Sequence, residues 1–589
     1  MRDQIRRIPA LLLASLILVC PLSSIPHAAA QTVLGDREVL LATLDDAALQ
    51  DLLATSGFLS LAQQGGAALL VMTEPGDAFH DFPDVFSSSS RGPLPDAFVK
   101  VDLGSMADEA GVASPAKLGA AAEQLASVLD RSTATSELVL LASNSPPGAS
   151  EAAGDHLGAM VMAEGSPKDL AAAIRAEASD ASVRTLTSDS TRREGVVASP
   201  DLAQTAFASG GLLAHDLGGE PIRVVDAPPP IDLHERYIQS KRLTVPIGTA
   251  AAFYAGLASL IAIIALSRPS ASRRVRAFCA SLAISVPFLA LSLLLVGHLP
   301  SLTYGTVIPF LIATTALVTI TLAVAARRWG TFGAIVAAGS ILLGALVVEA
   351  GLGWTAALTP LLGGSQLDGG RFFGLPNAFV GLLLGGSLYV AQRLPRVHGT
   401  ALIAVAGLFA GSPWTGSNIG AAVTLFAAAG IWLGLRGELS WWRTAIAAVA
   451  AIATGTVIVV VAHRFLTSAT THITTFSEHT GGIQGLWDRL VDRLGVGADL
   501  IADNPFALLP VIGVAVMLVV VLRPPGPIRP SFDGAPVWRV ALLTIVAASV
   551  VAYLVNDSGA AAVGEGLTTS LAGMLYVSLR WRDGMMMGL

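Results

Sequence analysis

Chemistry-bearing side chains gather in a glycine-rich interruption between two hydrophobic stretches, residues 359–377. Asp368 lies three residues before Arg371, and Arg371 is the only Lys or Arg in 329–392. A guanidinium suits the paired oxygens of a phosphate, and a carboxylate beside it can act as a general base. Because an unpaired charge at membrane depth is costly, these residues belong either to a solvated loop or to a site at the membrane boundary.

Two other short polar stretches stand between hydrophobic stretches, at 412–418 and 556–559. The topology derived below predicts that both lie on the same side of the membrane as 359–377. We therefore expect loops far apart in the chain to meet in one outward-facing polar cavity. The substrate-binding residues predicted for this cavity are Arg371, Asn377, Ser417, Asn418 and Asn556. Its predicted catalytic carboxylates are Asp557 and Asp368.

The composition is typical of a membrane protein. Of 589 residues, 53% are hydrophobic and 13% are charged, and the mean hydropathy of +0.65 is too high for an ordinary soluble protein. The net charge of -7 conceals an asymmetry, because acidic residues crowd the first 240 positions while arginines punctuate the later apolar runs. This distribution is not that of a nucleic-acid-binding protein, and we expect no nucleic-acid partner.

The first thirty residues have the pattern of a secretory signal. Three arginines precede an apolar core at 10–19, and small residues at 28–30 form a cleavage site. An anchor helix that stays uncleaved is the alternative. The two cysteines are Cys20, inside the signal, and Cys279, inside an apolar stretch, so we expect neither a disulfide framework nor a cysteine metal site.

Residues 31–230 are predicted to form an exported α/β domain, and 231–243 a linker to the membrane. Apolar runs of strand type alternate with alanine-rich helical patterns, an order that indicates a parallel sheet in an α/β sandwich. The predicted strands are 38–44, 67–72, 97–103, 137–142 and 157–163, and the clearest helices are 115–129 and 167–178. Chemistry in such sheets gathers at the carboxyl ends of the strands.

Three stretches of this domain resemble the alkaline phosphatase superfamily, in a shortened version known from multi-span bacterial envelope proteins. They are 39–45, 138–147 and 186–201. The resemblance implies a strand-end aspartate, here Asp45, a Ser or Thr nucleophile, and a later Asp-His pair that together bind two metals. Where that pair would follow the fourth strand, this chain has Ser-Asn-Ser at 143–145, whose side chains are poor ligands for a catalytic divalent metal. We therefore expect a domain without metal or cofactor that keeps the fold and has lost the hydrolysis.

An arginine pair in the same domain is a candidate anion-binding cluster. Arg192 and Arg193 follow the hydroxyl side chains of Ser188, Ser190 and Thr191, and guanidiniums with hydroxyls suit phosphate oxygens. The alternative, equally weighted, is that the arginines pair with acids of the domain itself.

From residue 244 the chain is predicted to form a membrane domain of about eleven spans. They are 244–266, 277–298, 305–326, 331–353, 376–392, 399–413, 418–435, 440–463, 505–522, 537–555 and 559–579. Arginines follow the odd-numbered spans, so these spans should end in the cytoplasm. We expect the bacterial inner membrane, with the N-terminal domain extracytoplasmic and the C-terminus cytoplasmic.

Two of these spans, 376–392 and 399–413, are too short to cross comfortably and are interrupted by proline and glycine. Broken helices are tolerated at membrane depth where they line a cavity. Residues 370–377 and 556–559 resemble the same envelope family, so the resemblance covers both halves of the chain. The longest outer loop, 464–504, contains two histidines and a glutamate. Their spacing is not diagnostic of a metal site, and we expect a solvated loop.

These patterns leave three functions open. The first is an envelope enzyme that handles a lipid-linked saccharide or another anionic lipid-like substrate. The second is a transporter or flippase-like protein whose exported domain is a lid or a module for envelope-protein partners; since no ATP-binding loop is found, an ion gradient or a partner would drive it. The third, ranked last because the metal ligands are missing, is a phosphohydrolase. In the first two, the partner is a membrane lipid or a lipid-linked envelope intermediate.

Overall fold

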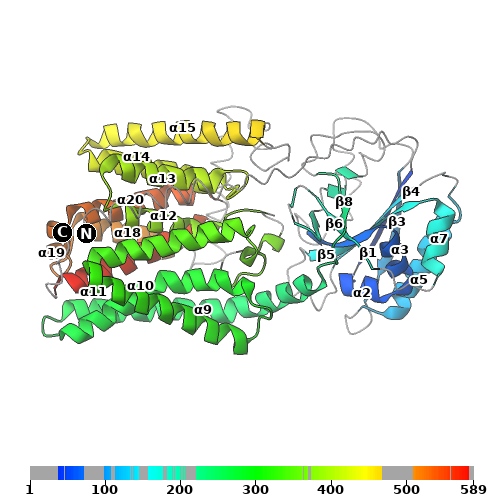
Figure 1. The fold of residues 1–589 in the computed structure, drawn as a ribbon, viewed down its shortest axis with the longest axis horizontal. Coiled ribbons are helices and arrows are strands. Elements are labelled where there is room, and N and C mark those ends of the chain that lie inside the picture. Colours follow the sequence, from blue (N-terminus) through cyan, green and yellow to red (C-terminus); the bar gives the residue numbers. More distant parts are fainter. Residues whose placement is uncertain are drawn as a thin grey trace.

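The structure is a computed structural model in which an α/β body stands beyond one end of a helix bundle (Figure 1). It describes residues 38–45, 47–71, 98–107, 113–132, 134, 137–144, 157–176, 182–188, 190–191, 193–198, 201–202, 204–205, 220–362, 364–368, 373–466, 509–556 and 559–582. The predicted signal at 1–30 and nearly all of the predicted outer loop 464–504 lie outside these ranges. The end of the bundle nearest the α/β body is called the α/β-facing end below.

The α/β body is built on a mixed sheet. Its strands are β1 (Glu38–Asp45), β2 (Gly66–Val71), β3 (Phe98–Ser105), β4 (Glu137–Asn144), β5 (Leu157–Gly165), β6 (Thr185–Thr187), β7 (Val196–Ala198) and β8 (Arg223–Val225). The order is β3-β1-β4-β5-β2-β6-β8, and β7 pairs with β2. Strand β1 is parallel to β3 and β4, but β5 runs antiparallel to β4 and β2. The prediction of a parallel sheet was therefore wrong for β5. The 12 residues between β4 and β5, 145–156, are at the lower limit of the dozen or more that a parallel crossover needs, and such a crossover usually contains a helix.

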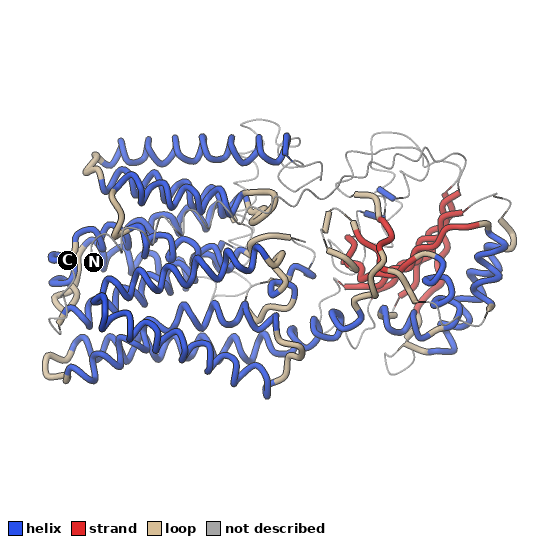
Figure 2. The backbone as a smooth tube through the Cα atoms, viewed as in Figure 1, coloured by secondary structure: helices blue, strands red, loops and turns tan. Residues whose placement is uncertain are grey.

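Helices cover one face of this sheet (Figure 2). They are α2 (Leu49–Ala54), α3 (Ser56–Gln64), α5 (Pro115–Leu129) and α7 (Pro167–Arg175). Successive strand residues point to opposite faces, so Leu40 and Ala42 pack into the helix-covered core while Val39 and Leu41 join a smaller cluster on the other face. Ser166 caps α7 by accepting a hydrogen bond from Asp169 N at 3.2 Å.

The bundle contains long apolar helices, so the protein is a membrane protein. Its helices are α9 (Ile231–Ser267), α10 (Arg273–Leu295), α11 (Tyr304–Gly351), α12 (Val380–Ala391), α13 (Arg396–Gly411), α14 (Ile419–Arg436), α15 (Trp441–Leu466), α18 (Leu509–Leu522), α19 (Arg529–Gly534), α20 (Pro536–Val555) and α21 (Gly559–Trp581). Within the described ranges, six are long and apolar enough to cross a membrane: α9, α10, α11, α14, α15 and α20.

Two helices differ from the predicted boundaries. Helix α9 begins at Ile231 and continues into the bundle, so residues 231–243 are the first turns of a helix and not a separate linker. Helix α11 includes two predicted spans, 305–326 and 331–353, which meet at a kink where Gly330 has φ 74°. Only glycine adopts such an angle without strain, so the kink marks the end of the first span.

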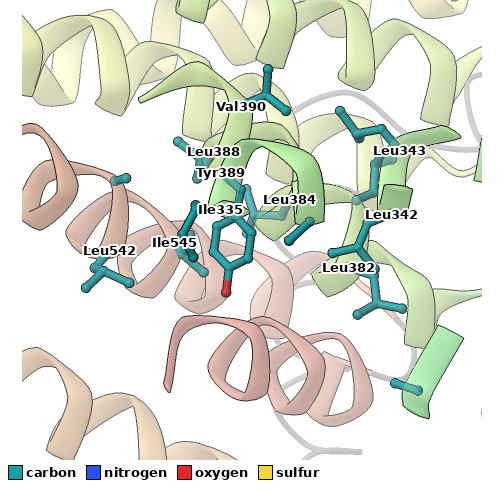
Figure 3. Packing of buried hydrophobic residues seen from close by; sticks show 14 of the residues in the cluster. Ile335, Leu342, Leu343, Leu382, Leu384, Leu388, Tyr389, Val390, Leu542 and Ile545 are labelled. Atoms are coloured by element: carbon teal, nitrogen blue, oxygen red, sulfur yellow. The ribbon is translucent and has the colours of Figure 1, made fainter. Parts of the chain in front are cut away.

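Helix α12 forms the centre of the bundle. All of its 12 residues are buried, and Tyr389 lies among Ile335, Leu542 and Ile545 of the surrounding helices (Figure 3). The Tyr389 hydroxyl donates to the Thr569 carbonyl of α21. A helix of this length is about 18 Å long, shorter than a hydrocarbon layer of about 30 Å. Irregular backbone must therefore complete the path of the chain at the α/β-facing end.

Candidate functional site

The α/β-facing end of the bundle is built from irregular segments. Between α11 and α12 the chain forms three single turns, η3 (Ala356–Leu358), η4 (Gln366–Asp368) and η5 (Asn377–Phe379). The 412–418 stretch joins α13 to α14, and Asn556 follows α20. Non-helical backbone at this level requires protein partners for its N–H and C=O groups. Some of those partners are residues predicted to form the site, and others, such as Gln366 and Trp354, were not predicted.

Asn418 joins two of the predicted loops. Its Nδ2 donates to Asn377 Oδ1 at 2.8 Å and to the Leu375 carbonyl at 2.9 Å. Its Oδ1 accepts from Ala421 N at 2.9 Å, which caps the first turn of α14. The side chain is completely buried. The predicted meeting of these two loops is therefore confirmed for Asn377 and Asn418, although 41 residues separate them.

The backbones of the same loops also touch. Leu375 N donates to the Gly416 carbonyl at 2.7 Å, and Gln366 Nε2 donates to the Gly374 carbonyl at 2.8 Å. Gly374 has φ 99°, and an ideal Cβ on it would lie 2.0 Å from the Gly416 oxygen. A side chain at this position would force the two loops apart.

Asn556 lies beside the start of α14. An ideal Cβ on Gly420 would lie 2.4 Å from Asn556 Oδ1, and Asn556 Nδ2 donates to the Ala552 carbonyl at 3.0 Å. Among the described residues, the buried Oδ1 atom accepts no hydrogen bond. Ser417 belongs to the same end, but its hydroxyl donates to the Pro413 carbonyl at 3.2 Å and so closes its own turn.

A Glu-His pair, of which only the glutamate is buried, lies at the end of α11. Glu349 is 1% exposed, and its Oε2 lies 2.7 Å from Nε2 of His298 in η2 (Val296–His298). Its Oε1 accepts from Ala356 N at 2.6 Å. Trp354 follows, with φ 61°, and its indole N–H donates to the Thr415 carbonyl. This network fixes the 352–358 backbone against the 412–418 stretch.

Arg193 extends from the α/β body to this network. Its Nη2 donates to the Trp354 carbonyl at 3.1 Å and to Gln366 Oε1. Burial lowers the pKa of Arg193 to about 10, and the nearby negative charge of Glu349 opposes that shift. The side chain therefore stays charged at neutral pH. The two alternatives for the arginine pair were anion binding and pairing with acids of the α/β domain. The described hydrogen bonds of Arg193 fit neither, because they join the α/β body to the bundle.

The hydroxyls predicted to accompany the arginines have other partners. Ser188 and Ser190 donate to the Asp201 carboxylate at 2.5 and 2.6 Å, and the amides of Ala198 and Glu220 donate to it at 2.7 and 2.9 Å. Burial raises the pKa of Asp201, and these donors oppose the rise. Ser188 and Ser190 therefore hold a carboxylate of their own domain, while the Thr191 hydroxyl donates to the Val196 carbonyl at 2.6 Å.

Several predicted residues lie outside the described part of the chain: Arg371, Asp557 and Arg192. Asp368 ends η4, and only its backbone is described. At the sheet, Leu44 is paired with Ser143, so Asp45 and Asn144 stand at neighbouring strand ends. Within the described ranges, no group of three or more His, Cys, Asp or Glu side chains could hold a metal.

The junction between the two bodies is also apolar. Tyr237 and Ile238 of α9, with Leu358 and Leu367 from the turns between α11 and α12, belong to the same core cluster as the helix-covered face of the sheet. Ser240 Oγ donates to the Pro360 carbonyl at 2.9 Å. The α/β body is therefore packed against the polar end of the bundle.

An apolar groove of about 640 Å³ lies apart from the polar end, between α9, α10 and the first half of α11. Phe278 and Ile312 line it and are largely exposed. Its polar atoms are mostly paired within the protein, as in the 2.6 Å contact between Tyr254 Oη and Ser285 Oγ. Because Phe278 and Ile312 are exposed, the groove opens at the outer surface of the helix bundle.

Sequence reasoning missed the His298–Glu349 pair and the contacts of Arg193. A lone histidine at the end of an apolar stretch has no distinctive sequence signal, and its partner is 51 residues away. The chain matches no protein-family model, and comparisons with curated proteins and with solved structures give no significant match.

Proposed function

We propose that this protein handles an anionic, lipid-like substrate of the bacterial cell envelope, such as a lipid-linked saccharide, at the α/β-facing end of the bundle. One observation carries the proposal. Polar residues from separate stretches, Asn377, Asn418 and Asn556, meet at this end beneath an exported-type domain. Polar residues within membrane segments are costly and mark functional sites.

The proposed roles follow from the chemistry of each group. Arg371, six residues before Asn377, binds the anionic group of the substrate in a bidentate manner. Asp557, adjacent to Asn556, or Asp368 acts as the base for a substrate hydroxyl. Asn556 Oδ1 supports a hydroxyl-bearing substrate, because it is buried and accepts no hydrogen bond from any described residue.

The groove between α9, α10 and α11 supports the lipid-like part of the proposal. Its lining is apolar and it opens at the surface of the bundle, so a hydrocarbon chain suits it better than a polar solute. Arg242 is exposed on α9, five residues before Ile247 of the groove lining. It adds a cation near the α/β-facing end of the groove.

The proposal also includes the orientation of the protein in the membrane and the origin of its α/β domain. Arginines after the odd-numbered spans favour an inner-membrane protein with the α/β domain extracytoplasmic. The resemblance to the alkaline phosphatase superfamily suggests a domain that has lost its hydrolytic metals and serves as a lid. The contacts of Arg193 with Trp354 and Gln366 support a lid role, since they tie this domain to the polar end.

A transporter or flippase-like function is the second candidate. The observation that favours it is the short, fully buried helix α12 with irregular backbone before it, because discontinuous helices surround the substrate sites of many transporters. In this version the same residues bind and release the substrate without changing it.

The test substitutes Arg371→Ala and Asp557→Asn and follows lipid-linked intermediates on both faces of the membrane. Arg175→Ala is the matched control, because Arg175 pairs with Glu123 and Asp130 on the exposed surface of the α/β body. Accumulation of a lipid-linked substrate on the outer face supports the enzyme, and its retention inside supports transport. Normal levels in both variants would refute the assignment of these residues to a substrate site.

A further inference from the structure

Helix α21 carries a single acidic residue, Glu565, about two turns from its first residue. The Oε2 atom is buried and makes no hydrogen bond with any described residue. An ionised carboxylate without a partner is strongly disfavoured inside a protein, because no water or donor replaces its hydration. The residue as a whole is half-buried, so one carboxylate oxygen is withdrawn from the surface while the side chain is not completely enclosed. The withdrawn oxygen favours a neutralising ligand or a bound proton.

Glu565 lies at the contact between α21 and α12. An ideal Cβ on Gly381 would lie 2.6 Å from the Glu565 carbonyl carbon, so the two backbones touch at this level. Gly385, one turn farther, would place a Cβ 2.3 Å from the Thr569 side chain. Helix α12 is fully buried and has no charged residue. The glutamate is therefore flanked by a fully buried helix that carries no charged side chain.

No charged group among the described residues acts on Glu565. The arginines of α10, α20 and α21 lie at the opposite end of the bundle, and at the near end Glu349 is already bonded to His298. The titratable side chains of α12 and α20 within the bundle are Tyr389, which donates to Thr569 O, and Tyr553; α18 has none.

We propose that Glu565 is a reversible proton-binding site within the helix bundle. A hydronium ion or buffer acid donates a proton to the carboxylate, which becomes a neutral carboxylic acid, and the same oxygen returns the proton to water when the site opens. A proton suits the site better than a metal ion, because one oxygen binds a proton whereas metal ions need several oxygen ligands. Among the described residues, Oε2 has no hydrogen-bond partner, and no group of three or more His, Cys, Asp or Glu side chains could hold a metal.

This inference goes beyond the substrate site. A buried acid that exchanges protons gives the bundle a means of coupling a proton to movement of the helices around α12. It stands whether or not the polar end binds a lipid, since none of its observations involves Arg371 or Asp557.

The test treats the full-length protein in lipid nanodiscs with dicyclohexylcarbodiimide, an apolar reagent that converts protonated carboxyls to stable acylureas. Peptide mass spectrometry should find the adduct on Glu565, with a yield that falls about tenfold per pH unit once the carboxyl ionises. The exposed carboxyls of Glu438 and Asp533 are internal controls and should stay unmodified. Glu565 without an adduct, or with a yield that is constant at every pH at which the protein stays folded, would overturn the proposal.

An infrared titration provides a second readout. The carbonyl stretch of a protonated carboxyl should disappear at alkaline pH in the wild-type protein, and this change should be missing in Glu565→Gln but present in the control Glu438→Gln. An unchanged difference spectrum in Glu565→Gln would refute the assignment. If Glu565→Gln fails to fold, carbodiimide labelling of the wild-type protein still tests the proposal, since it needs no variant.

Discussion

Arg193→Ala should loosen the junction between the α/β body and the bundle. The guanidinium donates two hydrogen bonds across the junction, to the Trp354 carbonyl and to Gln366 Oε1. Hydrogen bonds from a charged donor contribute about 1.5 to 3 kcal/mol each. Because water can replace part of this loss at a half-buried site, we expect a net cost near the lower limit, about 3 kcal/mol for the two bonds. Local opening of the junction should then become about a hundredfold more frequent.

Hydrogen exchange followed by mass spectrometry measures this opening directly. Peptides that cover 354–368 should exchange faster in Arg193→Ala, while peptides from the core helix α12 should keep their protection. The matched control is Arg175→Ala. It also removes an arginine from the α/β body, but this arginine pairs with Glu123 and Asp130 at the exposed surface. Unchanged exchange at 354–368 in Arg193→Ala, or an equal increase in Arg175→Ala, would refute the reasoning.

Three further predictions concern the polar end, the α/β body and the groove. Asn418→Ala loses two donated hydrogen bonds and a helix cap, so its unfolding free energy should fall by about 2 to 3 kcal/mol; Thr400→Ala, whose hydroxyl bonds only its own helix, should show little change in the same thermal unfolding assay. Asp201→Ala leaves four donors without their acceptor, and we expect it to unfold the α/β body at lower temperature while the bundle transition stays constant. Ala250→Trp fills the groove and should reduce the lipid that copurifies with the protein; equal lipid content would contradict the groove assignment.

The sequence predicted the elements of the α/β body well. Strands β1 to β5 begin and end within two residues of the predicted runs, and α5 has the predicted bounds. Short apolar runs flanked by turn residues, and a Ser-Pro start for α5, mark these elements locally. Strands β6, β7 and β8 have three residues each, which is too short for a periodic signal. The direction of β5 was missed because periodicity indicates a strand but not its orientation.

Part of the site was predicted because polar residues are rare beside apolar spans. Asn377 and Asn418 stood out for this reason, and the structure brings them together. The pairing of Glu349 with His298 was missed, since 51 residues separate the two. The contact of Arg193 with Trp354 joins residues 161 positions apart. Such pairs depend on how the two bodies pack, which no local pattern records.

The most direct test of the central claim is photo-crosslinking of lipid at the polar end. Trp414, in the 412–418 stretch, is 41% exposed, whereas Phe253 on the lipid-facing side of α9 is 72% exposed. A photoreactive residue at 414 should capture an anionic lipid-linked species, and Arg371→Ala should abolish that capture, while the same residue at 253 should capture only bulk phospholipid. Identical lipids at the two positions, with no effect of Arg371→Ala, would contradict the account.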